Sequence, residues 1–315
     1  MSSCVIILFQ NNTANLEGEN TTMSITAEEI ASQPQTWKQA IDMLASLDPK
    51  FFPQPGQSVA MIGCGTSWFM AQAYCRAREV AGHGVSDAFT ATEFPLTRHY
   101  DMVITLSRSG TTTEIIDILK ALHGKVPTRL ITAVGNGPAA PFTDMELVLD
   151  FADETSVVQT RFATTALALL RASLGENLTS AITDCETAVN AEIPAAFLTA
   201  DQFTFLGAGW TYGLANEAAL KMREASQSWT ESYPAMEYRH GPISIAEPNR
   251  ITWIFGSVPE GMEAQIAATG ATLVHHDYDP MASLVLLQRV AVARAEHRGL
   301  NPDTPRHLTR SVILS

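Results

Sequence analysis

Short apolar runs alternate with helix-like apolar spacing along the first half of the chain. In residues 101–122 the apolar run Met102–Leu106 ends in a hydroxyl-rich turn, and apolar residues then recur at helical intervals from Ile115 to Leu122. This pattern is typical of a buried strand, a turn and an amphipathic helix. Further strands are expected at residues 58–62, 85–89, 129–134 and 147–149. Alternating strands and helices predict an α/β fold whose parallel sheet is covered by helices on both faces.

The segments between these strands carry helix signals of their own. Thr26 and Glu29 form a capping pattern that predicts the first helix. Pro34 is expected to open a second helical segment that runs to Leu47. A long helix is expected from Val157 to Leu174, so the first half has enough helices to cover its sheet.

A short internal repeat divides the chain into two similar halves. MIGCGTSWFMAQA from Met61 and FLGAGWTYGLANE from Phe205 lie 144 residues apart, and both predict a strand, a glycine turn and a helix. Chance agreement of two such units is the alternative. The second half is expected to have strands at 202–206, 251–255 and 271–274 and helices at 211–226 and 281–297. The expected organisation is a disordered segment (1–25), two α/β domains (26–185 and 186–315) and a tail (301–315) that packs back.

Composition and charge narrow the classes of function. The 315 residues are 46% hydrophobic and 17% charged, which fits a globular chain with a large core. The net charge of −13 repels polyanions, so no nucleic-acid partner is expected. The apolar run at residues 4–9 is too short for a signal peptide or a membrane span, so no membrane partner is expected either. Met1 and Met23 both remain candidate start residues.

The four cysteines give no sign of a metal site. Cys4, Cys64, Cys75 and Cys185 form no C-x-x-C pair, which disfavours both a zinc site and a disulfide framework and fits reduced thiols in a cytoplasm. The adjacent His275 and His276 would point to opposite faces of a strand and cannot easily share an ion. We therefore expect neither a metal nor another cofactor.

Two hydroxyl-rich turns follow predicted strands, at residues 63–67 and 107–113. Hydroxyls, backbone N–H groups and a helix N-terminus that converge on one point suit a phosphate. The alternative for the second turn is an ordinary helix cap with Glu114 as its capping-box residue. Five hydroxyls, an arginine and a glycine exceed what a cap needs. Since both turns fall at carboxyl ends of strands, where ligands of such sheets lie, a phosphate site is favoured.

A second group of polar residues lies on the predicted helix 211–226. Glu217, Lys221 and Glu224 are spaced i, i+4 and i+7 and therefore share one face. They are either a solvated ion-pair ladder or a carboxylate beside an ammonium that moves protons at a substrate carbon. His240 precedes a Gly-Pro turn, which favours a surface or cleft position. The stretch before it, from Trp229 to Tyr238, is more typical of a site wall than of a core strand.

These motifs together resemble the sugar isomerase (SIS) domain family. The resemblance rests on GCGTS at 63–67, LSRSGTT at 106–112, EAALKMREAS at 217–226, HGP at 240–242 and PRHLTRSV at 305–312. The family includes the isomerase part of glucosamine-6-phosphate synthase and single-chain deaminases and deglycases of amino-sugar phosphates. The resemblance implies two tandem SIS subdomains, each with a parallel flavodoxin-like sheet and helices on both faces.

The resemblance also implies roles for individual residues. Glu224 would move the proton between C1 and C2, with Lys221 and Glu217 assisting. His240 would open the sugar ring, and because the family often supplies this histidine from the neighbouring subunit, a homodimer is expected. The implied phosphate-binding residues are Thr66, Ser67, Ser107, Ser109 and Thr112, and the same turns add Gly65 and Arg108. Val157 and Arg310 are further candidate substrate contacts.

Three departures from the synthase pattern affect the expected reaction. Only about 25 residues precede the first SIS helix and residue 2 is Ser2, so no glutaminase nucleophile is expected in this chain. Arg108 replaces a glutamine between the two phosphate-binding serines. Arg310 replaces the lysine that forms an imine with the ketose, and a guanidinium that stays protonated cannot do so.

The sequence therefore predicts a phosphosugar isomerase/deaminase that acts on an amino-sugar 6-phosphate. It would be of the glucosamine-6-phosphate deaminase or fructosamine-6-phosphate deglycase type, because such a substrate already carries its nitrogen. A plain aldose–ketose phosphate isomerase is an alternative that the sequence does not separate from it. The other alternative is a sugar-phosphate-binding regulator without catalysis. It is disfavoured because Glu224 and His240 are present and the chain is acidic.

Overall fold

The structure is a computed structural model that describes residues 23–314. Most of the segment expected to be disordered, with Cys4 and the first candidate start, therefore lies outside the described residues. The described part opens with Ser24, whose hydroxyl accepts from the backbone N–H of Ala27 and caps the first helix. The predicted capping pattern at Thr26 and Glu29 is wrong, because both residues lie inside this helix and bind other segments of the chain.

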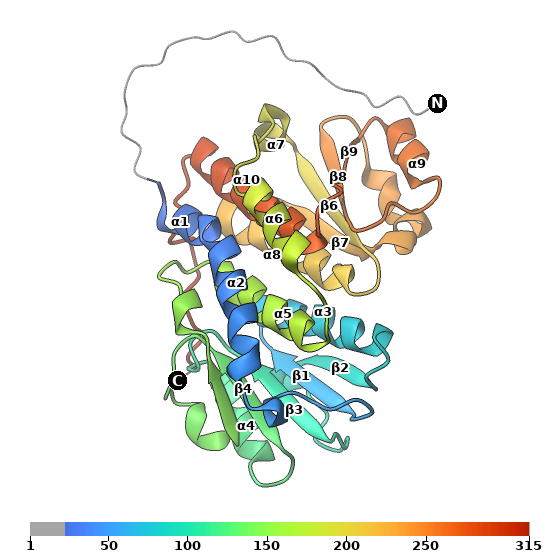
Figure 1. Cartoon of the computed structure of the whole chain (residues 1–315). Coiled ribbons are helices and arrows are strands. Elements are labelled where there is room, and N and C mark those ends of the chain that lie inside the picture. The colour runs from blue at the N-terminus through green and yellow to red at the C-terminus, as the bar shows by residue number, and fades with distance from the viewer. Residues whose placement is uncertain (1–22, 315) are drawn as a thin grey trace.

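Two all-parallel sheets organise the chain (Figure 1). The first has the order β2-β1-β3-β4-β5 and the second the order β7-β6-β8-β9. The first sheet contains β1 (Val59–Gly63), β2 (Ser86–Thr90), β3 (Met102–Leu106), β4 (Thr128–Thr132) and β5 (Met145–Val148). The second contains β6 (Gln202–Gly207), β7 (Thr230–Pro234), β8 (Arg250–Phe255) and β9 (Thr272–Val274). The predicted α/β class with parallel sheets is confirmed.

Helices connect the strands and cover both sheets. In the first half they are α1 (Ile25–Ala31), α2 (Gln33–Met43), α3 (Thr66–Val80), α4 (Thr113–Leu122), α5 (Arg161–Ser173) and α6 (Thr179–Ala188). In the second half they are α7 (Ala195–Thr199), α8 (Thr211–Ser226), α9 (Met262–Thr269) and α10 (Pro280–His297). The sequence did not predict α6, α7 or α9. The expected long helix from Val157 begins only at Arg161, so Val157 lies in the loop before it.

A helical layer between the two sheets contains the main core (Figure 1). This core joins Met61 and Ile104 of the first sheet, Phe205 and Trp253 of the second, and buried faces of α2, α3, α5, α8 and α10. The outer face of the first sheet packs against α4, and that of the second packs against α9. The proposed domain boundary after residue 185 falls within α6 and remains a proposal.

The two halves repeat each other in three dimensions. A Cβ on Gly63 would lie 2.4 Å from the backbone carbon of Ser67, and one on Gly207 would lie 2.3 Å from the backbone oxygen of Thr211. Both glycines end the first strand of a sheet and let the following helix turn back closely over it. These equivalent close approaches, 144 residues apart, support a true repeat rather than chance agreement.

The helices that follow these turns, α3 and α8, pack against each other through equivalent residues. Asn216 donates to Gln72 with 2.8 Å between Nδ2 and Oε1, and these residues are also 144 positions apart. A Cβ on Gly213 would lie only 2.5 Å from the backbone oxygen of Phe69, so only glycine permits this contact. The packing places the first turn of α3 beside the polar face of α8.

The segment before His240 contains a strand that the sequence analysis did not identify. Residues 230–234 form β7, an edge strand paired in parallel with β6, and the role of residues 229–238 as a site wall stays a prediction. A 3-10 helix, η6 (Ala235–His240), follows it. The strand was missed because its residues are mostly polar and only partly buried, so they lack the apolar run of a central strand.

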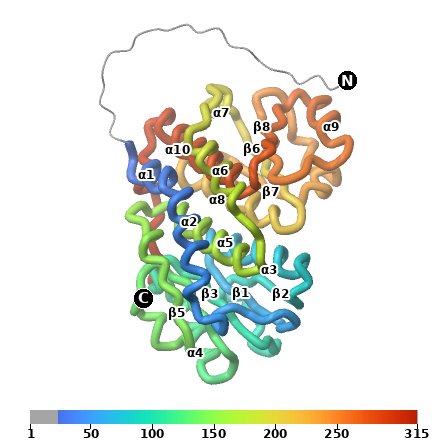
Figure 2. Tube along the Cα trace, viewed as in Figure 1, coloured from blue at the N-terminus to red at the C-terminus, as the bar shows by residue number. Residues whose placement is uncertain are grey.

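The C-terminal tail packs back onto the first sheet, as predicted. The trace in Figure 2 runs from α10 to the end of β3, far from α10 in sequence. There the N–H of Thr113 donates to the carbonyl of Val312 at 3.2 Å, and the N–H of Leu314 donates to the hydroxyl of Thr113 at 2.9 Å. The tail is thereby fixed beside the hydroxyl-rich turn that precedes α4.

Candidate active site

A cavity of about 200 Å³ opens at the carboxyl ends of β1 and β3. The register pairs Gly63 with Leu106, so the turns that follow these two strands lie side by side. The tail and Glu224 of α8 close other sides of the cavity. From the predicted set the cavity is lined by Gly65, Thr66, Ser67, Ser107, Arg108, Ser109, Thr112, Val157, Glu224 and Arg310. The structure thus brings most of the predicted site residues together.

Hydroxyl groups from the second turn and from the tail converge in this cavity. The hydroxyl of Ser311 lies 2.9 Å from that of Thr111 and 3.2 Å from that of Ser109. The hydroxyl of Ser109 also lies 2.7 Å from that of Thr111, and that of Ser107 lies 3.5 Å from that of Thr112. Several rotatable O–H donors in one place can surround the oxygens of a phosphate. The sequence missed Ser311, because only the tertiary position of the tail brings it here.

The first hydroxyl-rich turn, at residues 63–67, has a different role in the cavity. Gly65 has a φ of 55°, a left-handed value that lets the backbone enter α3 sharply. Ser67 and Thr66 are both buried. The hydroxyl of Thr66 donates to Oε1 of Glu217 at 3.3 Å, so it links the turn to α8. This turn therefore both lines the cavity and holds the polar residues of α8 in place.

Glu217, Lys221 and Glu224 form one buried group of charges on α8. The ammonium of Lys221 lies 3.4 Å from Oε1 of Glu217 and forms a close ion pair with Glu224. The side chains of Lys221 and Glu217 are each 1% exposed, whereas that of Glu224 is 19% exposed. The group is therefore not a solvated ladder. Only Glu224 reaches the cavity, and the other two lie behind it.

Burial and charge set the protonation of this group. Burial raises the pKa of Glu217 to about 8, and Glu224 adds to the increase although Lys221 opposes it. Burial lowers the pKa of Lys221, but the two carboxylates outweigh burial, so its pKa is raised overall. Near neutral pH, Lys221 is thus an ammonium that faces a protonated Glu217 and forms an ion pair with Glu224. Glu224 is the carboxylate of this group that faces the cavity.

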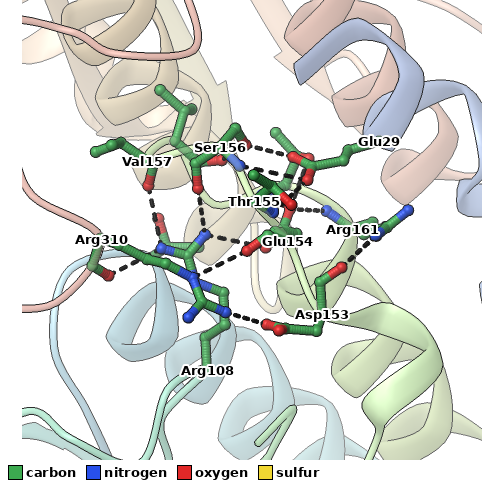
Figure 3. A network of polar contacts seen from close by, with 12 residues as sticks. Glu29, Arg108, Asp153, Glu154, Thr155, Ser156, Val157, Arg161 and Arg310 are labelled. Carbon is green, nitrogen blue, oxygen red and sulfur yellow. Dashed lines mark hydrogen bonds and ion pairs between the residues drawn. The ribbon is translucent and has the colours of Figure 1, made fainter. Parts of the chain in front are cut away.

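Arg108 lies in the cavity wall, but its guanidinium points to the chain itself (Figure 3). It forms a buried ion pair with Glu154, with 3.3 Å between Nη1 and Oε2. It also donates to the carbonyls of Ser156 and Val157, at 3.2 Å each, and of Arg310, at 2.9 Å. The sequence gave no signal for Glu154, because the residue looks like any loop carboxylate until the fold brings it to Arg108.

Arg310 also binds the chain rather than the open cavity. Its Nε donates to the carbonyl of Glu154 at 2.9 Å, and its Nη2 forms a close ion pair with Asp153. A second residue that the sequence missed is Gln159, which lines the cavity and whose Nε2 is buried without a partner among the described residues. Its amide is a candidate contact for a substrate oxygen.

His240 does not line the cavity in the described part of this chain. It ends η6 and is exposed. No group of three or more side chains suited to a metal occurs within residues 23–314. Over the same residues, no helix has both the length and the apolarity that crossing a bilayer requires.

Comparison with known proteins agrees with this fold. No family model matches the chain. It is 24% identical to the isomerizing glutamine–fructose-6-phosphate aminotransferase of Streptococcus pneumoniae strain R6, covering 94% of this chain and 60% of that protein. It is 26% identical to the protein of the same description from Bacillus subtilis strain 168, covering 81% of this chain and 51% of the other. The chain thus spans about half to three fifths of the curated relatives it matches.

Solved structures with the same fold include three sugar-phosphate proteins. Glucosamine-6-phosphate deaminase from Thermotoga maritima matches with a TM-score of 0.76 and 23% identity, over 92% of this chain and all of that chain. The C-terminal domain of glucosamine-fructose-6-phosphate aminotransferase from Francisella tularensis matches with a TM-score of 0.76 and 21% identity, over 92% of this chain and all of that domain. Tagatose-6-phosphate ketose/aldose isomerase from Escherichia coli matches with a TM-score of 0.74 and 19% identity, over 94% of this chain and 99% of that chain.

The fold is that of SIS-type phosphosugar isomerases, two parallel sheets around shared helices. In sequence the chain is similar to the isomerizing glutamine–fructose-6-phosphate aminotransferases, and in fold it is similar to the C-terminal domain of one of them.

Proposed function

We propose that this chain is a phosphosugar isomerase/deaminase that acts on an amino-sugar 6-phosphate by proton transfer between C1 and C2. The observation that carries the proposal is one cavity with hydroxyl-rich turns on one side and the carboxylate of Glu224, paired with Lys221, on another. The first feature suits the phosphate and the second suits a base at the far end of an open-chain sugar.

The phosphate would lie among the hydroxyls of Ser107, Ser109 and Thr112. Their turn precedes α4, so its backbone N–H groups and the positive end of the helix dipole add to the attraction. Ser67 and the backbone of Gly65 face the same cavity from the neighbouring turn. Ser311 would add a hydroxyl from the tail, and Val157 and Gln159 would contact the sugar.

Glu224 would take the proton from one carbon and return it to its neighbour. Lys221 holds this carboxylate in place through their ion pair. Protonated Glu217 keeps the buried group neutral, so the ammonium of Lys221 is balanced by Glu224 alone. Because the pKa of Lys221 is raised, its amine is not a nucleophile at working pH and would not form an imine.

Ring opening needs a separate acid and base at the ring oxygen. His240 is exposed on η6 and outside the cavity of its own chain. We therefore propose a homodimer in which His240 enters the partner's cavity. Mixing Glu224→Gln and His240→Asn chains would then restore one intact site per mixed dimer, or about a quarter of wild-type activity after random exchange. A fully active monomer, or no recovery on mixing, contradicts the dimeric site.

The breakdown direction is supported by Arg310. It stands where the resemblance implies an imine-forming lysine, and its guanidinium is held by Asp153. A substrate that already carries nitrogen requires no imine with the enzyme.

A second cavity favours a substituted amine as the leaving group. This space of about 410 Å³ adjoins the first at Glu224 and Leu308. It is lined by Arg223 and Arg306, neither of which forms an ion pair within residues 23–314, and by Trp229, which is 78% exposed. Two guanidinium groups and an indole suit a carboxylate on an apolar stem, so a deglycase-type substrate is the second candidate.

A substrate panel tests the proposal. The purified chain is incubated with glucosamine 6-phosphate, N-substituted fructosamine 6-phosphates and fructose 6-phosphate. Ammonia or amine and hexose 6-phosphate are then measured. We expect release of nitrogen with formation of a hexose 6-phosphate. Turnover of fructose 6-phosphate to an aldose without activity on any amino sugar would identify a plain isomerase instead.

A further inference from the structure

Arg108 is unusual among the cavity residues because its donors are already used within the chain. An arginine has five N–H donors, four of them on Nη1 and Nη2. In Arg108 these two nitrogens meet four acceptors, namely the carboxylate of Glu154 and the carbonyls of Ser156, Val157 and Arg310. Only Nε lacks a partner among the described residues, and it is buried. The side chain has little left to offer a phosphate.

Glu154 is bound as completely as Arg108. Its side chain has no exposed surface. Oε1 accepts from the backbone and hydroxyl of Thr160, at 2.6 and 2.8 Å, and from the backbone of Arg161 at 2.7 Å. These two N–H groups belong to the start of α5, so Glu154 joins that helix to Arg108. A buried charge needs its partner, because removing one member leaves the other uncompensated.

The ion pair lies where three segments meet (Figure 3). Glu29 of α1 binds the loop through the backbone of Thr155 and the hydroxyl of Ser156. Arg108 holds the next residues of this loop and also the carbonyl of Arg310. The following tail residue is Ser311, whose hydroxyl meets the phosphate-binding turn. Arg108 thus fixes the positions of both the loop 154–157 and the tail around the cavity.

We propose that Arg108 and Glu154 form a positioning pair, which holds residues 154–157 and the tail against the phosphate-binding turn, and that Arg108 does not bind phosphate. The pair is a positioning device for the reaction proposed above and rests on that function. A misplacement of about 1 Å at the reacting atoms can lower turnover by about 100-fold. Loss of either member should therefore lower kcat/KM.

The two roles of Arg108 predict opposite effects for Glu154→Gln. If Arg108 were a phosphate ligand, removing the nearby carboxylate would free its guanidinium and strengthen the binding of hexose 6-phosphates. If the pair is a positioning device, Glu154→Gln should behave like Arg108→Gln. Each would lower kcat/KM by about 10-fold to 100-fold, and the double variant would lose no more than either single variant.

The pH dependence of binding separates the roles further. A phosphate monoester gains its second charge near pH 6. A direct contact with Arg108 would make the affinity ratio of wild type to Arg108→Gln grow as pH rises from 5 to 7.5. A positioning role leaves this ratio constant. Arg171→Gln serves as the matched control, because it breaks a buried pair with Asp279 away from the cavity, and it should destabilise the fold without changing kcat/KM.

Hydrogen exchange of the tail amides tests the device without any substrate. We expect residues 308–314 to exchange at least about tenfold faster in Glu154→Gln than in wild type, since the tail loses its anchor. Arg108→Lys, which keeps the charge, provides the same measurement if the Gln variant does not fold. Unchanged tail exchange, or tighter hexose 6-phosphate binding in Glu154→Gln, overturns the proposal. Failure of wild type to bind any hexose 6-phosphate would instead refute the proposed function.

Discussion

Glu217→Gln should change how the stability of the fold depends on pH. In the folded chain burial raises the pKa of Glu217 from 4.5 to about 8. Between these two pH values the folded state binds a proton that the unfolded state has released. Since stability falls with pH wherever the folded state binds more protons, Glu217 stabilises most at low pH, and its contribution is lost as pH rises towards about 8.

The size of this effect follows from the shift. At about 1.4 kcal/mol per pKa unit, the change is at most about 5 kcal/mol of unfolding free energy. Glutamine resembles the protonated acid and does not titrate. We expect Glu217→Gln and wild type to have similar stability at pH 5, and the variant to become more stable by up to about 5 kcal/mol at pH 9.

Urea unfolding at several pH values between 5 and 9 measures this difference. Glu29, whose pKa is also raised by burial, is present in both chains and cancels. In wild type the pKa of Lys221 is raised above 10.5, outside this range. Glu263→Gln, an exposed carboxylate, controls for the lost surface charge. Parallel curves for wild type and Glu217→Gln, or a variant that is less stable at pH 9, would refute a protonated Glu217.

Three further predictions concern the phosphate, the helix contact and the tail. Ser109→Ala should weaken binding of hexose 6-phosphates by about 10-fold to 100-fold, because it removes one hydrogen bond to a charged group, and should leave the melting temperature unchanged. Equal affinity of the variant and wild type in calorimetry would contradict this prediction. Gly213→Ala should destabilise the chain by about 1–3 kcal/mol in urea unfolding, despite a helix propensity gain of about 1, because its Cβ meets the backbone of Phe69. Borohydride should trap no covalent adduct between fructose 6-phosphate and Arg310, as followed by intact mass spectrometry. Synthesis of glucosamine 6-phosphate from fructose 6-phosphate and ammonia should be slow or absent, and efficient synthesis would refute the breakdown direction.

Much of the fold could be predicted because local pattern and tertiary position agree. The apolar run 102–106 is a fully buried central strand, so its sequence alone identifies β3. The polar edge strand β7 could not be found in this way, because its pairing with β6 rather than its own residues makes it a strand. The cap of α1 was misplaced because Thr26 and Glu29 bind residues far away in sequence instead of their own helix.

In the candidate site, too, the features set by local spacing could be predicted and those set by tertiary packing could not. Helical spacing predicted that Glu217, Lys221 and Glu224 share a face, and their contacts confirm it. Their burial could not be predicted, since the same spacing fits a solvated face. The partner of Arg108 was equally hidden, because Glu154 is 46 residues away and the tail carbonyl is 202 residues away. Contacts of that kind are set by the packing of whole segments.

Exchange of solvent deuterium into the substrate tests the proposed chemistry most directly. Wild-type chain in D₂O should place deuterium at C1 or C2 of its hexose 6-phosphate, which is followed by NMR. Glu224→Gln should bind the same ligand with similar affinity but exchange about 100-fold to 10,000-fold more slowly, the usual contribution of a general base. Exchange at the wild-type rate in this variant would contradict the assignment of Glu224 as the base and, with it, the proposed proton transfer.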